Sequence, residues 1–453
     1  MEPGAKLGAT ARKSLGEGSF GGSMPVERCF VVRLSLSTGK GSLDFYVGSS
    51  QMVRRSVLAM FGVVAIVLGC VVVSMPAGAV VDSATIVPSP NAGTSTDHLL
   101  SVSCVSATEC VAVGYTIGSA YEALAMVWDG VDWSIVPIPN AGSYDRLLSS
   151  VSCVSATECV AVGYTITNGV YETLAMVWNG TVWSIMDSPN AGTIWDELLS
   201  VSCVSASECV AVGQTKTNSE TETLAMVWDG VDWSFVSSPN ATAIHDELKS
   251  VSCVSASECV AVGQSYTGAA WETLAMVWNG SVWAIVTSPN AGTRTDLLRS
   301  VSCVSVSECV AVGATNTGSA SETLVMVWNG SVWTIVSSPN AGTIEDQLFS
   351  VSCVSASECV AVGHTKAGSV WETLVTVWDG IEWSIVSSPN AGNLGDELFS
   401  VSCVSGSDCV AVGYTGAGNN VYETLVMSLT GSEPAPITTT TAPSDQVAPA
   451  YTG

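Results

Sequence analysis

The fourteen residues SCVSATECVAVGYT, from Ser103 to Thr116, return almost unchanged six more times, beginning near residues 152, 202, 252, 302, 352 and 402. A period of about 50 residues is typical of repeat architectures in which each repeat is one supersecondary unit. The second unit contains four short apolar segments separated by turn signals: one ends at Ser155, and the others cover 158–165, 172–180 and 182–186. Four strands per unit at this period predict the blade of a β-propeller.

A hairpin signal separates the third and fourth segments of the unit. Asn179 and Gly180 stand there in the second unit, and Asp-Gly or Asn-Gly occupies the same place in its neighbours. Because these dipeptides favour tight turns, we expect the third and fourth strands to form an antiparallel pair. The fourth strand begins with a tryptophan in six units: Trp133, Trp183, Trp233, Trp283, Trp333 and Trp383.

The seventh unit stops at ETLVMSLTG and lacks this fourth strand. The segment SATIVPSPNAG, from Ser83 to Gly93, aligns with WSIVPIPNAG from Trp133 and supplies the missing strand at the other end of the chain. We therefore predict an all-β, seven-bladed propeller over 83–431, with four antiparallel strands per blade. The N-terminal strand completes the last blade, so that no edge stays unpaired between the first and last blades.

Fourteen of the sixteen cysteines form C-x5-C pairs near the inner strands of the predicted blades. Zinc sites usually have shorter spacing and further ligands, which these pairs lack, so disulfides and an oxidising compartment are expected. Each would clip the first two strands of a blade and add about 2 kcal/mol of stability. The pairs are Cys104 and Cys110, Cys153 and Cys159, Cys203 and Cys209, Cys253 and Cys259, Cys303 and Cys309, Cys353 and Cys359, and Cys403 and Cys409.

An export signal precedes the repeats. After Met52, two arginines lead into an apolar run over 57–75 and an Ala-Gly-Ala site that ends at Ala79. This order predicts a signal peptide over 52–79. The run is also long enough to span a bilayer, and the alternative is an uncleaved anchor with the propeller outside. The expected location is therefore secreted or at the cell surface, with the membrane contacted only through an uncleaved N-terminal segment.

The ends of the chain carry no predicted fold. Residues 1–51 lie upstream of a complete signal, so we interpret them as an over-extended start or a disordered extension. Residues 432–453 are rich in proline and threonine and are expected to form an extended tail.

Two resemblances support this interpretation. The turn VWDGVDWSIV, which contains Asp129 and Gly130, distantly resembles the Asp-box turn of sialidase-type propellers, although the serine is absent and the Asp and Gly are adjacent. Over 83–431 the repeat is similar to secreted, disulfide-clipped repeat propellers of actinobacterial genomes. This resemblance implies the fold and export, and it implies no activity, because a fold does not determine a function.

The net charge of −26 disfavours nucleic acid and anionic lipid as partners. Three acidic residues recur in every unit. One interpretation is that these carboxylates bind Ca²⁺ or a cationic partner. The favoured interpretation is that they accept hydrogen bonds from backbone N–H groups at the ends of loops. We expect the same role for the asparagine in SPN. The three series are Asp97, Asp145, Asp196, Asp246, Asp296, Asp346 and Asp396; Glu122, Glu172, Glu222, Glu272, Glu322, Glu372 and Glu423; and Glu109, Glu158, Glu208, Glu258, Glu308, Glu358 and Asp408.

The long loops, second-to-third and fourth-to-first, open on one face of a propeller, and a binding site is expected there. Aromatic residues beside carboxylates in these loops are typical of sugar-binding sites, and the favoured alternative is that each packs over its own blade end. Thr221 and Ser321 interrupt the aromatic series, and His245 lies in a fourth-to-first loop. The candidate ligand-binding residues are Tyr121, Tyr171, Trp195, Trp271, Trp371 and Tyr422.

No catalytic or metal site is predicted. No pair of carboxylates is singled out for glycoside cleavage. The arginines (Arg146, Arg294 and Arg299) and the histidines (His98, His245 and His364) occupy unlike positions in different units. We therefore predict a monomeric, non-catalytic binding or structural module at the cell surface that binds an extracellular glycan or protein. It has no cofactor, and Ca²⁺ is weakly indicated. The alternative is an extracellular carbohydrate-active enzyme, sialidase-like or another glycosidase.

Overall fold

The computed structural model describes residues 80–93, 96–139, 145–292, 294–342, 344–418 and 421–431. Their regular structure is entirely β, in strands β1 to β28. None of these residues belongs to a helix that could cross a membrane. The predicted segments 1–51, 52–79 and 432–453, together with the possible anchor, lie outside the described residues.

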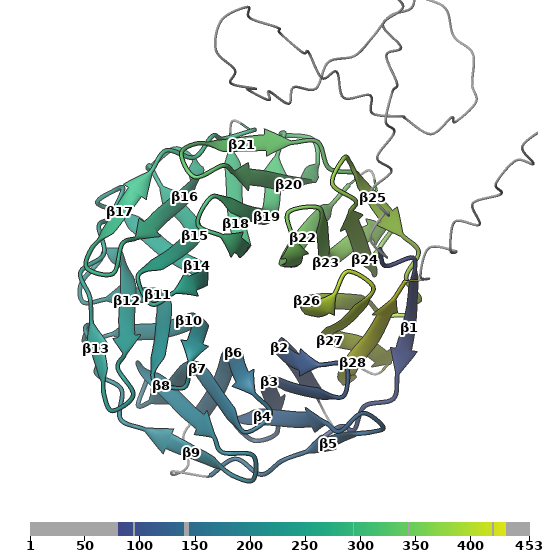
Figure 1. Cartoon of the computed structure of the whole chain (residues 1–453), viewed down its shortest axis with the longest axis horizontal. Helices are drawn as coiled ribbons and strands as arrows, with labels where there is room; N and C mark the ends of the chain where they lie inside the picture. Colours follow the sequence, from purple (N-terminus) through teal and green to yellow (C-terminus); the bar gives the residue numbers. More distant parts are fainter. Residues whose placement is uncertain are drawn as a thin grey trace, which may run out of the picture. The chain divides into compact units, whose positions relative to one another are not determined.

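Strand pairing divides the described chain into four-stranded antiparallel blades, and the propeller fold is confirmed (Figure 1). Blade 1 contains β2 (Thr96–Ser106), β3 (Glu109–Ile117), β4 (Tyr121–Trp128) and β5 (Trp133–Ile135). Blade 2 contains β6 (Asp145–Ser155), β7 (Glu158–Thr167), β8 (Val170–Trp178) and β9 (Trp183–Met186). Blade 3 contains β10 (Trp195–Ser205), β11 (Glu208–Lys216), β12 (Thr221–Trp228) and β13 (Trp233–Phe235).

The remaining blades repeat this order. Blade 4 contains β14 (His245–Ser255), β15 (Glu258–Tyr266), β16 (Trp271–Trp278) and β17 (Trp283–Val286). Blade 5 contains β18 (Thr295–Ser305), β19 (Glu308–Asn316), β20 (Ser321–Trp328) and β21 (Trp333–Val336). Blade 6 contains β22 (Asp346–Ser355), β23 (Glu358–Ala367), β24 (Val370–Trp378) and β25 (Trp383–Val386). In each blade the first strand is innermost and the fourth lies on the rim (Figure 1).

Blade 7 is assembled from both ends of the described chain. It contains β26 (Asp396–Ser405), β27 (Asp408–Gly418) and β28 (Val421–Thr430), and its outer strand is β1 (Ser83–Val87). β1 pairs antiparallel with β28, from Ser83 opposite Thr430 to Val87 opposite Val426. The side chain of Asn91 then accepts a hydrogen bond from the Thr424 N–H at 2.8 Å. The predicted use of the N-terminal strand is confirmed.

Serine side chains join each first strand to the first strand of the next blade. In blade 1, Ser101 Oγ accepts the Val151 N–H at 3.1 Å and Ser103 Oγ accepts the Cys153 N–H at 3.0 Å. Equivalent bonds follow at the next five junctions, which satisfies backbone groups that face no strand of their own blade. The last blade bonds to the first in the same way, through Ser400 and Ser402 to Val102 and Cys104.

Apolar side chains fill the space between blades. Each first strand places one leucine at 0% exposure: Leu99, Leu148, Leu198, Leu248, Leu298, Leu348 and Leu398. The tryptophan that starts the fourth strand is also buried, at 2–6% exposure in six blades. A second tryptophan ends the third strand of the same blades. In blade 5 this residue is Trp328, whose indole N–H donates a hydrogen bond to Val306 O, 3.1 Å away, in the turn between the first and second strands. Large rings therefore fill the outer part of blades 1 to 6 and also fix the inner turn of each.

All seven predicted disulfides are confirmed, each with a Cα–Cα distance of 4.0 Å. The two cysteines of a pair lie directly opposite each other in the ladder, as Cys203 and Cys209 do. Multiple disulfides of this kind indicate an oxidising environment.

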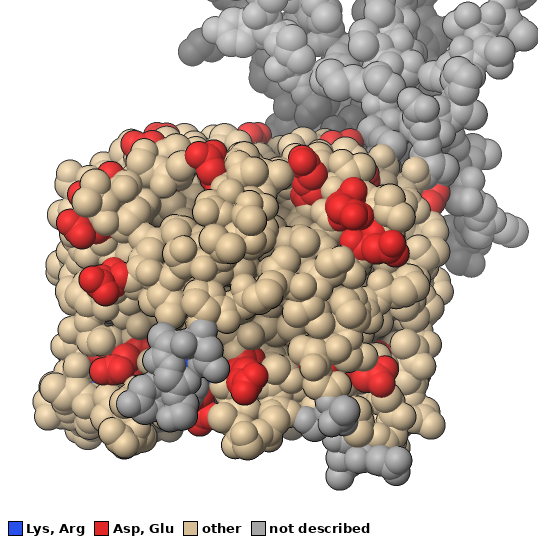
Figure 2. Space-filling view, turned by 90° about the horizontal axis from the view of Figure 1, so that it is seen from below, with Lys and Arg blue, Asp and Glu red and all other residues tan. Residues whose placement is uncertain are grey.

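Both ends of the described chain lie beside the disulfide turn of blade 7. The Val81 N–H donates to Gly406 O at 3.1 Å, and the Gly431 N–H donates to Ser407 O at 2.9 Å. The chain therefore enters and leaves the propeller on the face opposite to the long loops. Seen from the side, acidic side chains lie near the edges of the two faces, and the outer surface between them is largely uncharged (Figure 2).

Candidate functional site

The first acidic series has a structural role. Asp196 is 1% exposed and accepts the Gly192 N–H at 2.9 Å, and the same bond occurs at Asp97, Asp246, Asp296, Asp346 and Asp396. These carboxylates cap the fourth-to-first loop, as the favoured interpretation predicts. Asp145 also accepts a loop-end N–H, but it lies one residue before the position of the series. The loop before β6 is as long as the loop before β10, and Arg146 pairs with Thr165 where Asp196 pairs with Thr215.

Arg146 replaces the capping carboxylate with a different contact. It is 6% exposed and donates from its guanidinium to Pro139 O at 3.0 Å. Asp145 moves to the position that Trp195 holds in blade 3, where its side chain accepts the Tyr121 N–H at 2.8 Å.

The other repeated polar residues also bond within the framework. Glu208 accepts a hydrogen bond from Ser205 Oγ at 3.1 Å inside the disulfide turn, and five other blades repeat it. The SPN asparagine accepts a backbone N–H of the third strand, as Asn190 does from Thr173 at 2.8 Å. The second acidic series lies exposed or half-buried on the long-loop face. Within the described ranges, no three His, Cys, Asp or Glu side chains are grouped closely enough to hold a metal ion.

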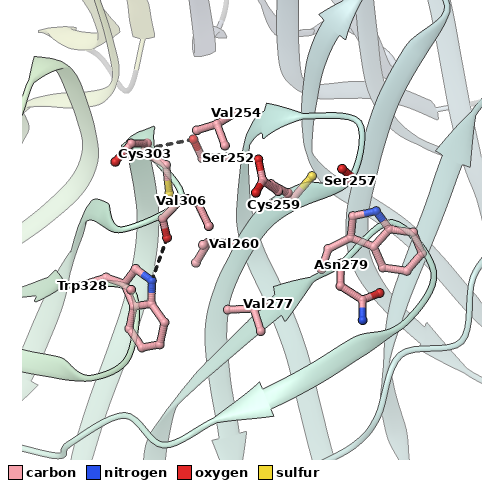
Figure 3. Close-up of a pocket in the computed structure, with 14 residues that line it drawn as sticks. Ser252, Val254, Ser257, Cys259, Val260, Val277, Asn279, Cys303, Val306 and Trp328 are labelled. Carbon is pink, nitrogen blue, oxygen red and sulfur yellow. Dashed lines mark hydrogen bonds between the residues drawn. The ribbon is translucent and has the colours of Figure 1, made fainter.

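The disulfide-turn face carries grooves between blades. A pocket of about 350 Å³ lies between blades 4 and 5, and Ser252, Val306 and Trp328 help to line it (Figure 3). The same groove measures about 310 Å³ between blades 1 and 2 and about 70 Å³ between blades 3 and 4. Its polar groups already have framework partners: Ser252 accepts the Cys303 N–H and Trp328 bonds to Val306 O. A groove that repeats with the framework, on the face where the chain enters, is a weak candidate for a specific site.

The long-loop face differs from the disulfide-turn face, because its side chains near the axis do not follow the repeat. Near the axis it carries side chains from the start of each first strand and from the facing residue of the second strand, and we call these fourteen residues the axial cluster. Unlike the framework, they differ from blade to blade. The first-strand members are His98, Leu147, Glu197, Glu247, Leu297, Gln347 and Glu397, and their partners in the same order are Tyr115, Tyr164, Gln214, Gln264, Ala314, His364 and Tyr414.

Blades 6, 7 and 1 bring two histidines to one carboxylate. His364 Nδ1 lies 2.9 Å from Glu397 Oε2, and the Tyr414 hydroxyl donates to the other oxygen of Glu397. Burial opposes ionisation, but these two bonds lower the pKa of Glu397. His98 stacks on Tyr414 at a ring distance of 4.3 Å and bonds to the Tyr115 hydroxyl at 2.9 Å. Burial lowers the pKa of His98 to about 4, so this ring is neutral at neutral pH.

His98 and His364 contact two side chains of blade 7 that are hydrogen-bonded to each other: His98 stacks on Tyr414, and His364 bonds to Glu397. The two histidines lie in different repeats and at different positions within them, but neighbouring blades bring both toward Tyr414 and Glu397. Only the ring geometry could have revealed this, because the repeat period alone does not say which strands meet near the axis.

Blades 3 and 4 place glutamates at the same position, and each accepts a hydrogen bond from the glutamine of its own second strand, Gln214 or Gln264, but within the described chain only Glu247 also has a cationic partner. Glu247 accepts a hydrogen bond from Lys249 Nζ at 2.9 Å, and His245 Nε2 lies 3.9 Å away. Although burial opposes it, His245 and Lys249 lower the pKa of Glu247. Glu197 accepts one from Gln214 Nε2 at 2.7 Å, and burial raises its pKa.

Blade 5 opens a pocket in the ring of aromatic side chains. Small residues, Ala314 and Ser321, stand where other blades carry tyrosine, tryptophan or histidine, and a pocket of about 330 Å³ lies there against Gln347. The Arg299 guanidinium donates to Gln347 Oε1 at 3.0 Å and lies 4.7 Å from the centre of the Phe349 ring. This part of the long-loop face therefore offers a hollow that is lined by the Gln347 carboxamide, to which Arg299 donates a hydrogen bond.

The candidate aromatic residues lie around the axial cluster and pack on its members or on adjacent loops. Tyr121 is 41% exposed, and the others are half-buried. Their ligand-binding role stays a prediction. The ring-centroid distances are 5.5 Å for Tyr121 with Tyr115, 4.4 Å for Tyr171 with Trp195, 4.9 Å for Trp271 with His245, 4.2 Å for Trp371 with His364 and 5.1 Å for Tyr422 with Tyr414.

No protein-family model and no curated protein matches the chain. Among solved structures, YCF48 bound to a D1 peptide is 14% identical, with a TM-score of 0.48 over 78% of this chain and 100% of that chain. The GH74 xyloglucanase from Xanthomonas campestris is 11% identical, with a TM-score of 0.49 over 76% of this chain and 55% of that chain. A PL25 ulvan lyase is 9% identical, with a TM-score of 0.46 over 77% and 96%. These proteins are similar to this chain in their β-propeller-like fold alone.

Proposed function

We propose that the protein is an exported, non-catalytic binding module that holds a carbohydrate on the long-loop face, at the axial cluster. The observation that carries this proposal is the contrast between a repeated framework and a cluster whose side chains vary among the blades. A framework side chain has a bonding partner that recurs with the repeat. The axial cluster instead combines aromatic rings, carboxylates and carboxamides, which are groups that orient a polyhydroxylated ligand.

The position of the chain ends supports the same face. Val81 and Gly431 lie at the disulfide turn of blade 7, so any segment attached to either residue starts from the opposite side. The long-loop face then stays open to a ligand even when the chain is tethered at one end.

A glycan array probed with the full, oxidised chain tests the proposal, followed by calorimetry with each bound glycan. We expect saturable binding that the Tyr171→Ala, Trp271→Ala double variant weakens at least tenfold. Phe235→Ala is the matched control, because Phe235 is 41% exposed but belongs to the rim strand β13. Absence of binding to any glycan, or equal loss in the control, would contradict the proposal.

A carbohydrate-cleaving enzyme is the second candidate, and one observation favours it. Glu197 and Glu247 occupy the same position in adjacent blades, yet burial raises the pKa of the first while His245 and Lys249 lower that of the second. Glycosidases require such a division between acid and base. Release of new reducing ends from a polysaccharide panel, abolished in Glu197→Gln, would establish this activity. Binding without any product would leave the module non-catalytic.

A further inference from the structure

Glu197 is a buried carboxylate that lacks a positive partner. It is 6% exposed, and the hydrogen bond that it accepts comes from the neutral amide of Gln214. Among the described residues, the ion pairs within 4.0 Å that involve the axial glutamates belong to Glu247 and Glu397, and none belongs to Glu197. Burying a carboxylate without a counter-charge costs free energy, which a ligand of opposite charge can offset.

The adjacent blade provides a direct comparison. Glu247, 5% exposed, is neutralised by Lys249, which lies two residues along the same strand. The corresponding residue beside Glu197 is Leu199, which carries no charge. The two carboxylates at this position of the repeat therefore differ: Lys249 forms an ion pair with Glu247, whereas Glu197 has no cation within 4.0 Å in the described part of the chain and the charge of Lys249 acts on it only from a longer distance.

Aromatic rings lie near Glu197 on the long-loop face. Trp195 lies two residues before Glu197, so both side chains project from the same face of β10. Tyr171 stacks on Trp195 with centroids 4.4 Å apart and planes inclined by 18°, and Tyr164 lies 5.4 Å from Tyr171. Burial raises the pKa of Tyr164, and the charge of Glu197 adds to the rise, so this hydroxyl is within the electrostatic reach of the carboxylate.

Aromatic faces attract cations through their quadrupoles, and the attraction grows when the site is shielded from water. Three rings beside one unpaired carboxylate therefore favour an ammonium group over a neutral hydroxyl or an anion. The long-range field points the same way, because a chain with a net charge of −26 raises the local concentration of cations.

We propose that Tyr164, Tyr171, Trp195 and Glu197 bind the ammonium group of an amino sugar, with Glu197 as its counter-ion and the rings as its wall. This inference rests on the proposed carbohydrate-binding function and names the class of saccharide. An N-acetylated or neutral sugar fits the rings equally well but leaves the carboxylate without its charge partner.

Calorimetric titration of the full chain with oligomers of β-1,4-linked glucosamine, and with the N-acetylated oligomers of equal length, tests this assignment. We expect the amino form to bind at least tenfold more tightly at neutral pH and low salt. Glu197→Gln should abolish this preference. Leu199→Lys should abolish it too, because it supplies the internal cation that Lys249 supplies in the next blade.

Glu208→Gln is the matched control, because it removes a carboxylate of the same blade from the disulfide turn on the opposite face and should keep the preference. Circular dichroism confirms that each variant is folded. Equal affinity of the wild-type chain for both oligomers, or a preference that survives Glu197→Gln, would overturn the inference and leave the proposed function standing. Tight binding of a lysine peptide but not of glucosamine oligomers would overturn the saccharide assignment. Failure of every glycan, including those on the array, would overturn the proposed function itself.

Discussion

Ser400 Oγ accepts a hydrogen bond from the Val102 N–H, 3.1 Å away, across the junction between the last and the first blade. Ser200 makes the same bond to Val251, also at 3.1 Å, between blades 3 and 4. Because each substitution leaves a buried N–H without its partner, we expect Ser400→Ala and Ser200→Ala to lower the free energy of unfolding equally, by about 1 kcal/mol. Urea denaturation measures both. A Ser400→Ala chain as stable as the wild type would show that this junction is not closed in solution.

Gly213, the last residue of VAVG in blade 3, is expected to tolerate no side chain. A β-bulge between Leu198 and Ser200 brings the carbonyl of Glu197 against Gly213, and a Cβ atom at 213 would overlap that oxygen. We expect Gly213→Ala to lower the free energy of unfolding by more than about 2 kcal/mol. Gly118 is the control, because its Cβ would meet no atom within 4 Å, and Gly118→Ala should be neutral or stabilising by about 0.5 kcal/mol. Thermal denaturation of the two variants should separate them clearly.

Each disulfide should contribute separately to stability. The Cys203→Ala, Cys209→Ala double variant removes one clip and should lower the free energy of unfolding by about 2 kcal/mol, because the unfolded chain loses one closed loop. Guanidinium denaturation under oxidising conditions measures the change. The same double substitution in another blade, at Cys303 and Cys309, should give a similar value. No change in either variant would mean that the clips do not constrain the unfolded chain.

Acid should destabilise the propeller through His98. Burial lowers the pKa of this ring from 6.5 to about 4. As the pH falls between these values the unfolded chain binds a proton that the folded chain does not, so the free energy of unfolding decreases, by about 2 kcal/mol. His98→Gln removes the titrating group and should flatten this part of the stability curve. Urea denaturation at a series of pH values tests it, and an unchanged slope would assign the acid sensitivity to other groups.

The sequence was sufficient to predict features that depend on local pattern. Strand number per repeat, the hairpin turns and the pairing of Cys203 with Cys209 follow from period, turn residues and spacing within one unit. The role of Ser83–Gly93 also followed, because one unit visibly lacks a strand and another segment matches it.

Features that depend on how neighbouring repeats meet could not be predicted in this way. Within one repeat, the serines of SVS are explained by their small size alone. Their role as hydrogen-bond acceptors depends on backbone N–H groups of the next blade. Asp145 of blade 2 accepts the Tyr121 N–H of blade 1, a contact that no position within its own repeat indicates. Glu397 has its two bonding partners in β23 and β27, on separate blades, so no window of the sequence contains the group.

The pairing of β1 with β28 has a mechanical consequence. Ser83 lies opposite Thr430, so the two ends of the described chain emerge side by side from one end of an antiparallel ladder. Tension applied between them would separate the hydrogen bonds one after another, as in a zipper, and force spectroscopy should record a low first rupture before the blades yield. A propeller held by only one of its ends carries no load across this ladder.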